Sequence, residues 1–210
     1  MKKQLYFLLT AGILGIAGCR QPEQELPILG PRIPIEKQVE GQTVTDTLYH
    51  QVPDFHFTDQ NGLPVTASTF EGKVYIADFF FTTCPTICPV MKNNLLKVYE
   101  AYKDSASVSI LSHSIDPVHD SVAVLKDYAN RLEVQAPGWY FVTGNQDSIF
   151  SIARQYMVSA LEDKEAPGGY AHSGALILMD KQRHIRGYYD GTEEEATKKL
   201  IRDIKILLNE

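Results

Sequence analysis

The residues with the clearest chemical potential are two cysteines, Cys84 and Cys88, which are separated by three residues in the stretch TTCPTICP. Residues four apart lie on one face of a helical turn, so these thiols could share a soft metal ion or form a disulfide. Pro89 disfavours helical geometry at Cys88, which predicts a helix beginning near Pro89 with both sulfur atoms at its N-terminus. The dipole and free N–H groups there lower a thiol pKa and favour the thiolate, which binds metals and attacks disulfides. An inert disulfide or two packed thiols is the alternative.

The elements on either side of this cysteine pair are predicted to form a strand, a turn and a helix. Residues 73–81 (KVYIADFFF) are a nearly continuous apolar run rich in β-formers, which is typical of a central strand buried on both faces. Residues 90–102 carry apolar side chains at helical spacing, at Met91, Leu95 and Val98. Sites in α/β sheets gather at the carboxyl ends of strands, and the cysteines lie there.

The rest of the chain continues this alternation of strands and helices. Residues 53–70 predict a hairpin with its turn at Asn61-Gly62. Further strands are expected over 107–115, 139–143, 174–179 and 184–189, and helices over 120–132, 147–157 and from a capping box of Thr192 and Glu195 to the C-terminus. This order predicts an α/β fold with a central mixed sheet flanked by helices and an N-terminal β-hairpin extension.

The N-terminus has the pattern of a bacterial lipoprotein signal. Lys2 and Lys3 precede an apolar stretch that is too short to span a bilayer comfortably, and the stretch ends in the small residues before Cys19. This pattern resembles a lipobox and predicts a signal peptide over 1–18, lipid attachment at Cys19 and a domain outside the cytoplasm, in the cell envelope. An uncleaved membrane anchor is the alternative.

Between this signal and the domain, the sequence predicts a linker. Residues 19–49 contain several prolines and many polar residues with no persistent period, which indicates a flexible tether with a reach of about 30 Å. The globular domain is then expected over 50–210. A formal net charge of −6 makes nucleic acid a poor candidate partner.

The motif FFFTTCPTICPVM resembles the SCO/SenC family of copper-binding proteins, whose C-P-x-x-C-P segment follows the first core strand of a thioredoxin-like fold. The resemblance extends over roughly 50–208. It includes the segments DFHFTDQNG, SIDPVHDS, GWYFVTG and GGYAHSGALILMD.

The resemblance implies a copper site made by two cysteines and one distal histidine, at Cys84, Cys88 and His172. Two thiolates and one imidazole suit Cu(I), which takes soft ligands, and the same set can hold Cu(II). Zinc remains an alternative, although structural zinc usually has four protein ligands. A histidine before a strand can also be an ordinary surface or packing residue.

Three further residues near this site have open roles. Asp116, in the family's Asp-Pro segment, could orient His172 or a metal-bound water, or simply begin a turn. Asp78 lies inside the apolar strand, six residues before Cys84, like the buried Asp of thioredoxins that assists thiol chemistry; otherwise it is a hydrogen-bonded strand residue. His113 could approach the metal from the end of its strand.

The resemblance implies a membrane-anchored copper chaperone that delivers copper to the copper centre of a terminal cytochrome c oxidase. Its partners would be the oxidase subunit that carries this centre and another copper chaperone or thiol reductase. The alternative is a thiol–disulfide oxidoreductase that reduces the oxidase cysteines through Cys84 and Cys88. A peroxiredoxin-like peroxidase fits poorly, because Ala77 and Phe81 stand where its P-x-x-x-T-x-x-C motif needs Pro and Thr.

Overall fold

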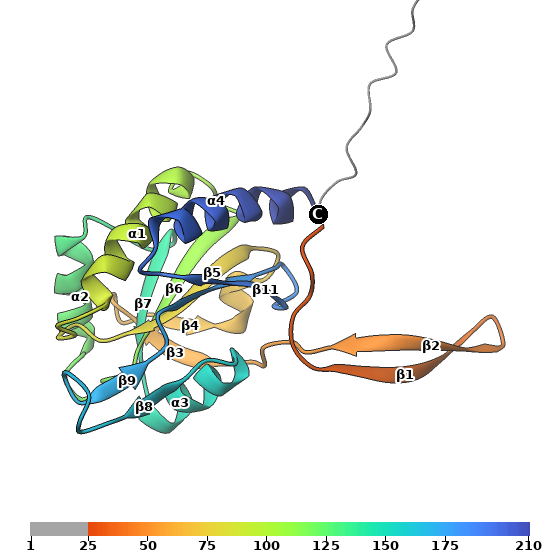
Figure 1. Ribbon diagram of the computed structural model, residues 1–210, viewed down its shortest axis with the longest axis horizontal. Coiled ribbons are helices and arrows are strands. Elements are labelled where there is room, and N and C mark those ends of the chain that lie inside the picture. Colours follow the sequence, from red (N-terminus) through yellow and green to blue (C-terminus); the bar gives the residue numbers. More distant parts are fainter. Residues whose placement is uncertain (1–24) are drawn as a thin grey trace, which may run out of the picture.

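The computed structural model describes residues 25–210, so the predicted signal peptide and Cys19 lie outside the described residues. A seven-stranded sheet has the order β11-β10-β5-β6-β7-β3-β4 (Figure 1). Its strands are β3 (His56–Asp59), β4 (Pro64–Thr66), β5 (Val74–Phe80), β6 (Val108–Ser114), β7 (Trp139–Thr143), β10 (Ala175–Met179) and β11 (Ile185–Asp190). The strands β5, β6 and β7 are parallel, and the other pairs are antiparallel, as expected for a mixed sheet.

Helices cover both faces of this sheet. They are α1 (Cys88–Tyr102), α2 (Val122–Arg131), α3 (Gln146–Gln155) and α4 (Glu194–Asn209), with a 3-10 turn over Ala67–Phe70. Successive residues of a strand point to opposite faces, and Phe80 packs against Tyr128 of α2 while Phe79 packs against Tyr156 at the end of α3. Helices α1 and α4 pack side by side over the sheet (Figure 1). Among the described residues, no helix has the length and apolar character needed to cross a membrane.

The central strand β5 is buried along its whole length, as its continuous apolar sequence predicts. Every predicted strand and helix after residue 53 is present, with ends that differ by a few residues. The predicted capping box is absent, because Thr192 bonds Asp190 and Glu193 precedes α4 without a side-chain cap.

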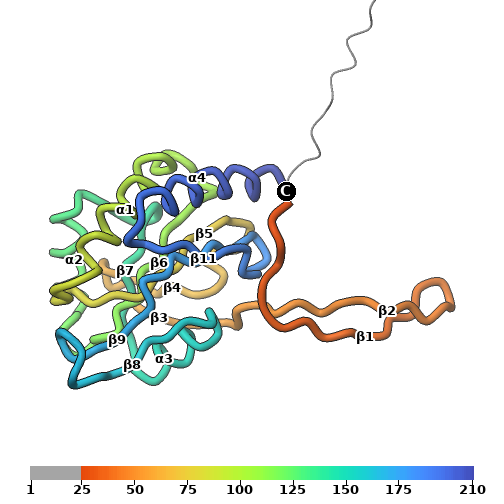
Figure 2. The backbone as a smooth tube through the Cα atoms, in the orientation of Figure 1, coloured from red at the N-terminus to blue at the C-terminus, as the bar shows by residue number. Residues whose placement is uncertain are grey.

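Residues 25–49 differ from the expected featureless tether. Strands β1 (Arg32–Val39) and β2 (Gln42–Tyr49) pair as an antiparallel hairpin that stands away from the domain (Figure 2). Its turn is made by Glu40 and Gly41, which both have positive φ, as a two-residue hairpin turn requires. Pro34 inside β1 and the absence of an Asn-Gly turn obscured the alternation of apolar residues in this segment.

A second short hairpin was also missed from the sequence. Strands β8 (Ala160–Glu162) and β9 (Tyr170–His172) form a separate two-stranded sheet at the end of the domain opposite to the β1–β2 hairpin (Figure 1). Three-residue strands are too short to show a period. This small sheet matters because it carries His172.

Candidate metal centre

The cysteine turn connects the end of β5 to the start of α1. Cys84 lies in the turn, where its N–H group bonds the carbonyl of Phe81 at 3.2 Å, and Cys88 is the first residue of α1. Strand β9 brings His172 to the same place across 84 residues of sequence separation. The ligand atoms of Cys84, Cys88 and His172 all lie within 4.8 Å of one another, and they form the one such cluster of potential metal ligands within residues 25–210. Both cysteines are free thiols.

The imidazole of His172 is oriented for ligation. Its Nδ1 lies 3.0 Å from the carbonyl oxygen of Ser173, and its Nε2 lies 3.3 Å from the Sγ atom of Cys88. A carbonyl only accepts hydrogen bonds, so Nδ1 carries a proton and Nε2 of the neutral ring is left free toward the sulfur atoms. A metal ligand needs such a nitrogen with a fixed tautomer.

The loop before β9 is shaped to bring this histidine close. Gly168 has a φ of +83°, and a Cβ atom there would lie 2.7 Å from the ring of Phe81. The Phe81 ring in turn contacts both Tyr170 and His172, with ring centroids 5.4 and 6.0 Å apart. A glycine at position 168 therefore lets the loop pass directly over the strand end that precedes the cysteines.

The two thiols differ in their acidity. Burial raises the pKa of Cys84, but hydrogen bonds from the Cys88 thiol and from the backbone N–H groups of Thr86 and Cys88 outweigh it and lower that pKa to about 6. Burial, together with the neighbouring Cys84, raises the pKa of Cys88. The expectation that both sulfur atoms are favoured as thiolates holds for Cys84 and is wrong for Cys88, because one charge in a buried pair opposes a second. A soft cation between them would offset that opposition.

The carboxylate of Asp78 is paired, and its partner is not a cysteine. The buried Lys92 of α1 places its Nζ atom 2.5 Å from Asp78 and donates a hydrogen bond to Ser112 at 2.9 Å. Ser112 also donates to Asp78 and accepts from Trp139 at 2.9 Å. The Lys92 charge is among the influences that lower the pKa of Cys88, so Asp78 is connected to the thiols through its partner Lys92.

Sequence reasoning missed Lys92, although a signal was present. Lys92 follows Cys88 by four residues and lies next to Met91 on a helix whose buried side chains are otherwise mostly apolar. A buried lysine needs a partner, and Asp78 is the carboxylate in the strand beneath α1. A lysine on this helix face therefore signals that a carboxylate partner exists, and the structure identifies that partner as Asp78.

Asp116 begins the turn after β6, which is one of the two roles considered for it, and its side chain bonds Tyr170 and His119 rather than His172. Its carboxylate accepts a hydrogen bond from Tyr170 at 3.1 Å and lies 2.7 Å from Nδ1 of His119. Its carbonyl accepts from the N–H groups of His119 and Asp120, so it also begins the turn after β6. Asp116 therefore holds Tyr170, two residues before His172 on β9, and has no hydrogen bond to His172 itself.

A second buried carboxylate fixes the approach to the cysteine turn. Asp120 accepts hydrogen bonds from the N–H and hydroxyl groups of Thr82 and from the hydroxyl of Ser114, the last at 2.5 Å. These bonds connect the chain just after β5 to the end of β6. The roles of Asp120, Tyr170 and Lys92 depend on contacts between distant segments, which no local sequence pattern shows.

His113 does not join the site. Its ring stacks on Phe79 at 4.7 Å, on the face of the sheet that α3 covers. Burial lowers its pKa to about 4, and its Nε2 atom has no hydrogen-bond partner. His113 is therefore a neutral residue of the core, and the idea that it approaches the metal is wrong.

Comparison with known proteins agrees with this geometry. The family model of SCO1/SenC matches residues 44–209. The chain belongs to the SCO1/SenC family. Among solved structures, a SCO1/SenC family lipoprotein from Bacillus anthracis str. Ames has 29% sequence identity and a TM-score of 0.68, over 75% of this chain and 95% of that chain.

Two other structures of SCO1/SenC relatives bear on the site. BsSco, described as a member of the Sco family of cytochrome c oxidase assembly proteins with a disulfide switch, has 29% identity and a TM-score of 0.66, over 75% of this chain and 93% of its own. Bradyrhizobium japonicum ScoI, solved with copper bound, has 28% identity and a TM-score of 0.61, over 72% of this chain and 98% of that chain. These neighbours confirm the predicted family and its thioredoxin-like fold.

Proposed function

We propose that this protein binds one copper ion through Cys84, Cys88 and His172 and delivers it to the copper centre of a terminal cytochrome c oxidase. The observation that carries the proposal is the convergence of two free thiols and one oriented imidazole within 4.8 Å. The copper-bound ScoI structure and the assembly role stated for the Sco family support copper as the ion and the oxidase as the partner.

The chemistry of the donor set favours copper over harder metals. Thiolate and imidazole are soft or borderline ligands, and Cu(I) accepts a low coordination number. Cys84 is the thiolate that is present at neutral pH, whereas Cys88 must lose its proton when the ion binds. Copper uptake is therefore expected to release a proton, and copper release to a partner to restore it.

The proposed location follows from the sequence of the N-terminus. Lipid attachment at Cys19 would hold the domain on a membrane of the bacterial cell envelope, on the side where a terminal oxidase exposes its copper centre. The lipoprotein from Bacillus anthracis supports this arrangement for the family. A further copper chaperone or a thiol reductase would supply the ion or keep both cysteines reduced.

A second function is favoured by the asymmetry of the two thiols. The Cys84 thiolate would attack a partner's disulfide, forming a mixed disulfide and releasing one partner thiolate. The neighbouring Cys88 would then displace the second partner sulfur, which leaves a Cys84–Cys88 disulfide and a fully reduced partner with two electrons transferred. A disulfide switch has been identified in BsSco. Oxidation of this pair would also prevent copper binding.

Metal analysis and visible absorption of the reduced mature chain test the main proposal. We expect one copper per chain and a thiolate-to-Cu(II) charge-transfer band that is lost in His172→Ala. The matched control is His56→Ala, which removes an exposed histidine outside the cluster and should keep the band. If copper is not retained and Cys84 and Cys88 instead exchange readily with a glutathione buffer, the oxidoreductase function replaces the chaperone function.

A further inference from the structure

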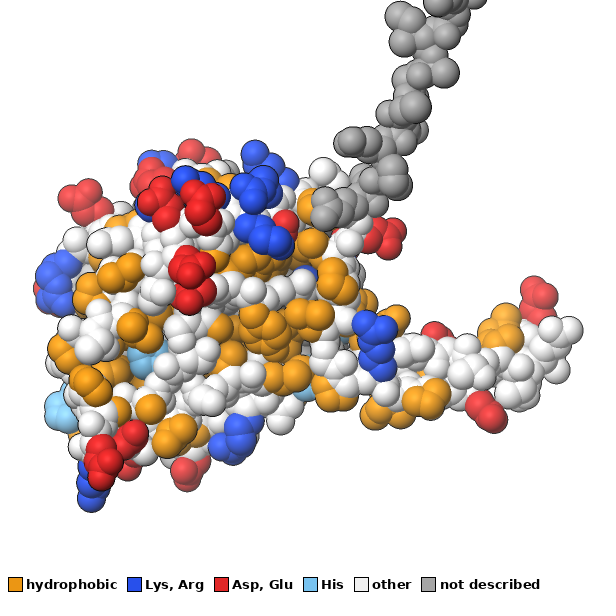
Figure 3. Space-filling model, viewed as in Figure 1, with side chains coloured by type: hydrophobic (Ala, Val, Ile, Leu, Met, Phe, Trp, Pro, Cys, Tyr) orange, Lys and Arg blue, Asp and Glu red, His pale blue; other side chains and the backbone are white. Residues whose placement is uncertain are grey.

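The β1–β2 hairpin has an apolar face that nothing in the domain covers. Residues on one side of the ribbon are Ile33, Ile35, Lys37 and Val39 of β1 and Gln42, Val44, Asp46 and Leu48 of β2. The side chains of Ile33, Val39, Val44 and Leu48 are 56, 51, 39 and 54% exposed. Hydrophobic side chains are visible along the hairpin in Figure 3. These exposed apolar side chains are interrupted only by Gln42 and by the Lys37–Asp46 pair, and an apolar surface of this kind marks a site of interaction.

The opposite side of the ribbon is polar. It carries Arg32, Pro34, Glu36, Gln38, Thr43, Thr45, Thr47 and Tyr49. The hairpin is therefore amphipathic in the way that an antiparallel sheet is when one face is covered. An isolated two-stranded hairpin is only marginally stable in water, so covering the apolar face would also stabilise the hairpin.

The charges on the apolar face cancel. Lys37 and Asp46 form an ion pair with each other across the two strands, and the face carries no other charged residue. A surface without net charge and with few hydrogen-bonding groups suits a lipid environment better than a polar protein surface.

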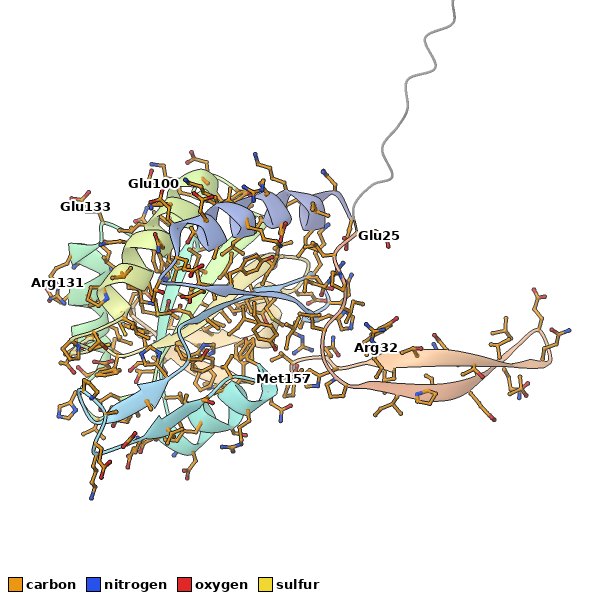
Figure 4. All side chains as sticks on the ribbon, viewed as in Figure 1. Glu25, Arg32, Glu100, Arg131, Glu133 and Met157 are labelled. Atoms are coloured by element: carbon orange, nitrogen blue, oxygen red, sulfur yellow. The ribbon has the colours of Figure 1, made fainter. Side chains whose placement is uncertain are left out.

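The base of the hairpin is fixed to the domain at the point where the chain leaves toward Cys19. The buried Arg186 donates to the carbonyls of Leu26 and Pro27 at 2.5 and 3.3 Å, and the N–H group of Leu29 bonds the carbonyl of Ile185 at 2.7 Å. Figure 4 shows Glu25 next to the end of α4 and Arg32 at the base of the hairpin. These hydrogen bonds fix the position of the hairpin base relative to the domain.

The chain that remains between this point and the predicted lipid is short. Residues 20–25 separate Cys19 from Leu26, and this distance of seven residue steps is at most about 25 Å. The hairpin itself is about 26 Å long, since each strand has eight residues. The short connection keeps the base of the hairpin within reach of the headgroups, and a hairpin turned flat would contact the membrane surface along its length.

We propose that the apolar face of the β1–β2 hairpin lies in the interface of the membrane to which Cys19 is attached. The inference rests on lipid attachment at Cys19 but not on copper binding. The hairpin would act as a second membrane contact beside the lipid, and two contacts fix an orientation that a single flexible tether cannot. The cysteine turn and the β8–β9 sheet lie at the opposite end of the domain from the hairpin (Figure 1). With the hairpin flat on the bilayer, the metal centre would therefore lie away from the hairpin along the membrane surface.

Tryptophan fluorescence of the full lipidated chain in vesicles tests this orientation. The chain has a single tryptophan, Trp139, which is fully buried and supplies a constant background. Leu48→Trp places a reporter on the apolar face, and Thr47→Trp places the matched control one residue away on the polar face. The vesicles contain phosphatidylethanolamine and phosphatidylglycerol, with or without brominated acyl chains that quench on contact.

In brominated vesicles, Leu48→Trp should lose most of its added emission and be shifted to shorter wavelength, whereas Thr47→Trp should keep its emission. Val44→Trp and Thr45→Trp repeat the comparison nearer the hairpin turn, in case one substitution disturbs the strand pairing. Equal quenching, or no quenching, of both members of each pair would overturn the proposal.

Two other outcomes would also overturn it. A dimer in detergent, with Leu48→Trp shifted but not quenched by lipid, would assign the apolar face to a second copy of the chain. A mass that shows no lipid on Cys19 would remove the premise. Copper content measured on the same samples reports on the metal centre independently, so a failure of the membrane contact is distinguishable from a failure of the proposed function.

Discussion

The central strand β5 is buried along its whole length and leads directly into the cysteine turn, whereas no residue of β1 or β2 is buried. The first region obtains its geometry from the core, because strands on both sides and helices above and below determine where its last residue lies. The second region obtains its geometry from one turn and a few bonds at its base. The cysteine side of the metal centre is thus held by the core, while the stability of the hairpin depends on what covers its apolar face.

The buried ion pair beneath the cysteine turn gives the largest expected effect. Lys92→Met removes the partner of a fully buried Asp78 and should lower the free energy of unfolding by about 3–5 kcal/mol. Denaturant unfolding monitored by circular dichroism measures it. The control is Lys97→Met on the same helix, whose ion pair with Glu194 is exposed. Equal effects of the two substitutions would contradict the assignment of the pair as structural support for the site.

Truncating one isoleucine in β5 and one in β1 measures how much each region contributes to the free energy of unfolding. Ile76→Ala in β5 should cost about 2–5 kcal/mol of unfolding free energy, because the side chain is fully buried. Ile33→Ala in β1 should change the unfolding of the domain in solution by about 0.5 kcal/mol or less, because its side chain is 56% exposed. A similar cost at both positions would mean that the hairpin is part of the cooperative core.

The buried His113 predicts an acid-dependent loss of stability. Burial lowers its folded-state pKa to about 4, below the ordinary value of 6.5, so the unfolded chain takes up a proton first as the pH falls. Protonation of His113 does not affect the free energy of unfolding above about pH 6.5. As the pH falls to about 4, it lowers that free energy by about 3 kcal/mol. The free energy of unfolding of His113→Phe should therefore depend less on pH over this range than that of the natural chain. In the control His56→Ala, the pH dependence should equal that of the natural chain. An unchanged pH dependence in His113→Phe would exclude this source.

The hydrogen bond that holds β9 predicts a smaller effect, limited to the metal centre. Tyr170→Phe removes the bond to Asp116 and loosens the strand that carries His172, so the affinity for copper should fall by about tenfold. Competition with a chromophoric chelator measures it. Tyr102→Phe is the control, since it removes a hydroxyl bond to Ile201 between α1 and α4 and should leave the affinity unchanged. An equal loss in both variants would point to a general loss of packing.

The contrast between the two regions also explains what the sequence could predict. The strand before Cys84 was predictable because it is a nearly continuous apolar run, and the helix after it because its apolar residues repeat at helical spacing. The β1–β2 hairpin packs against no core, and its Glu40-Gly41 turn lacks a strong sequence signal, so its alternation was overlooked. The apolar residues of β1 and β2 still alternate, and this alternation is the pattern that a covered face would produce.

The metal centre was predictable only in part. The position of His172 came from the family resemblance, because no period in the sequence links it to the cysteines. The contacts of Asp78 and Asp116 were left open, and the structure assigns them to Lys92 and Tyr170. Such contacts join segments that are far apart in the chain, so burial of a charge signals that a partner exists without saying which residue it is.

X-ray absorption spectroscopy at the copper edge tests the central claim most directly. The copper-loaded mature chain should show two sulfur ligands and one imidazole, with the imidazole signal lost in His172→Ala and one sulfur lost in Cys88→Ser. Both cysteines are in place before the ion arrives, so the same sulfur ligands are expected for Cu(I) and Cu(II). A spectrum with no sulfur ligand, or one that is identical in the natural chain and in His172→Ala, would contradict the account.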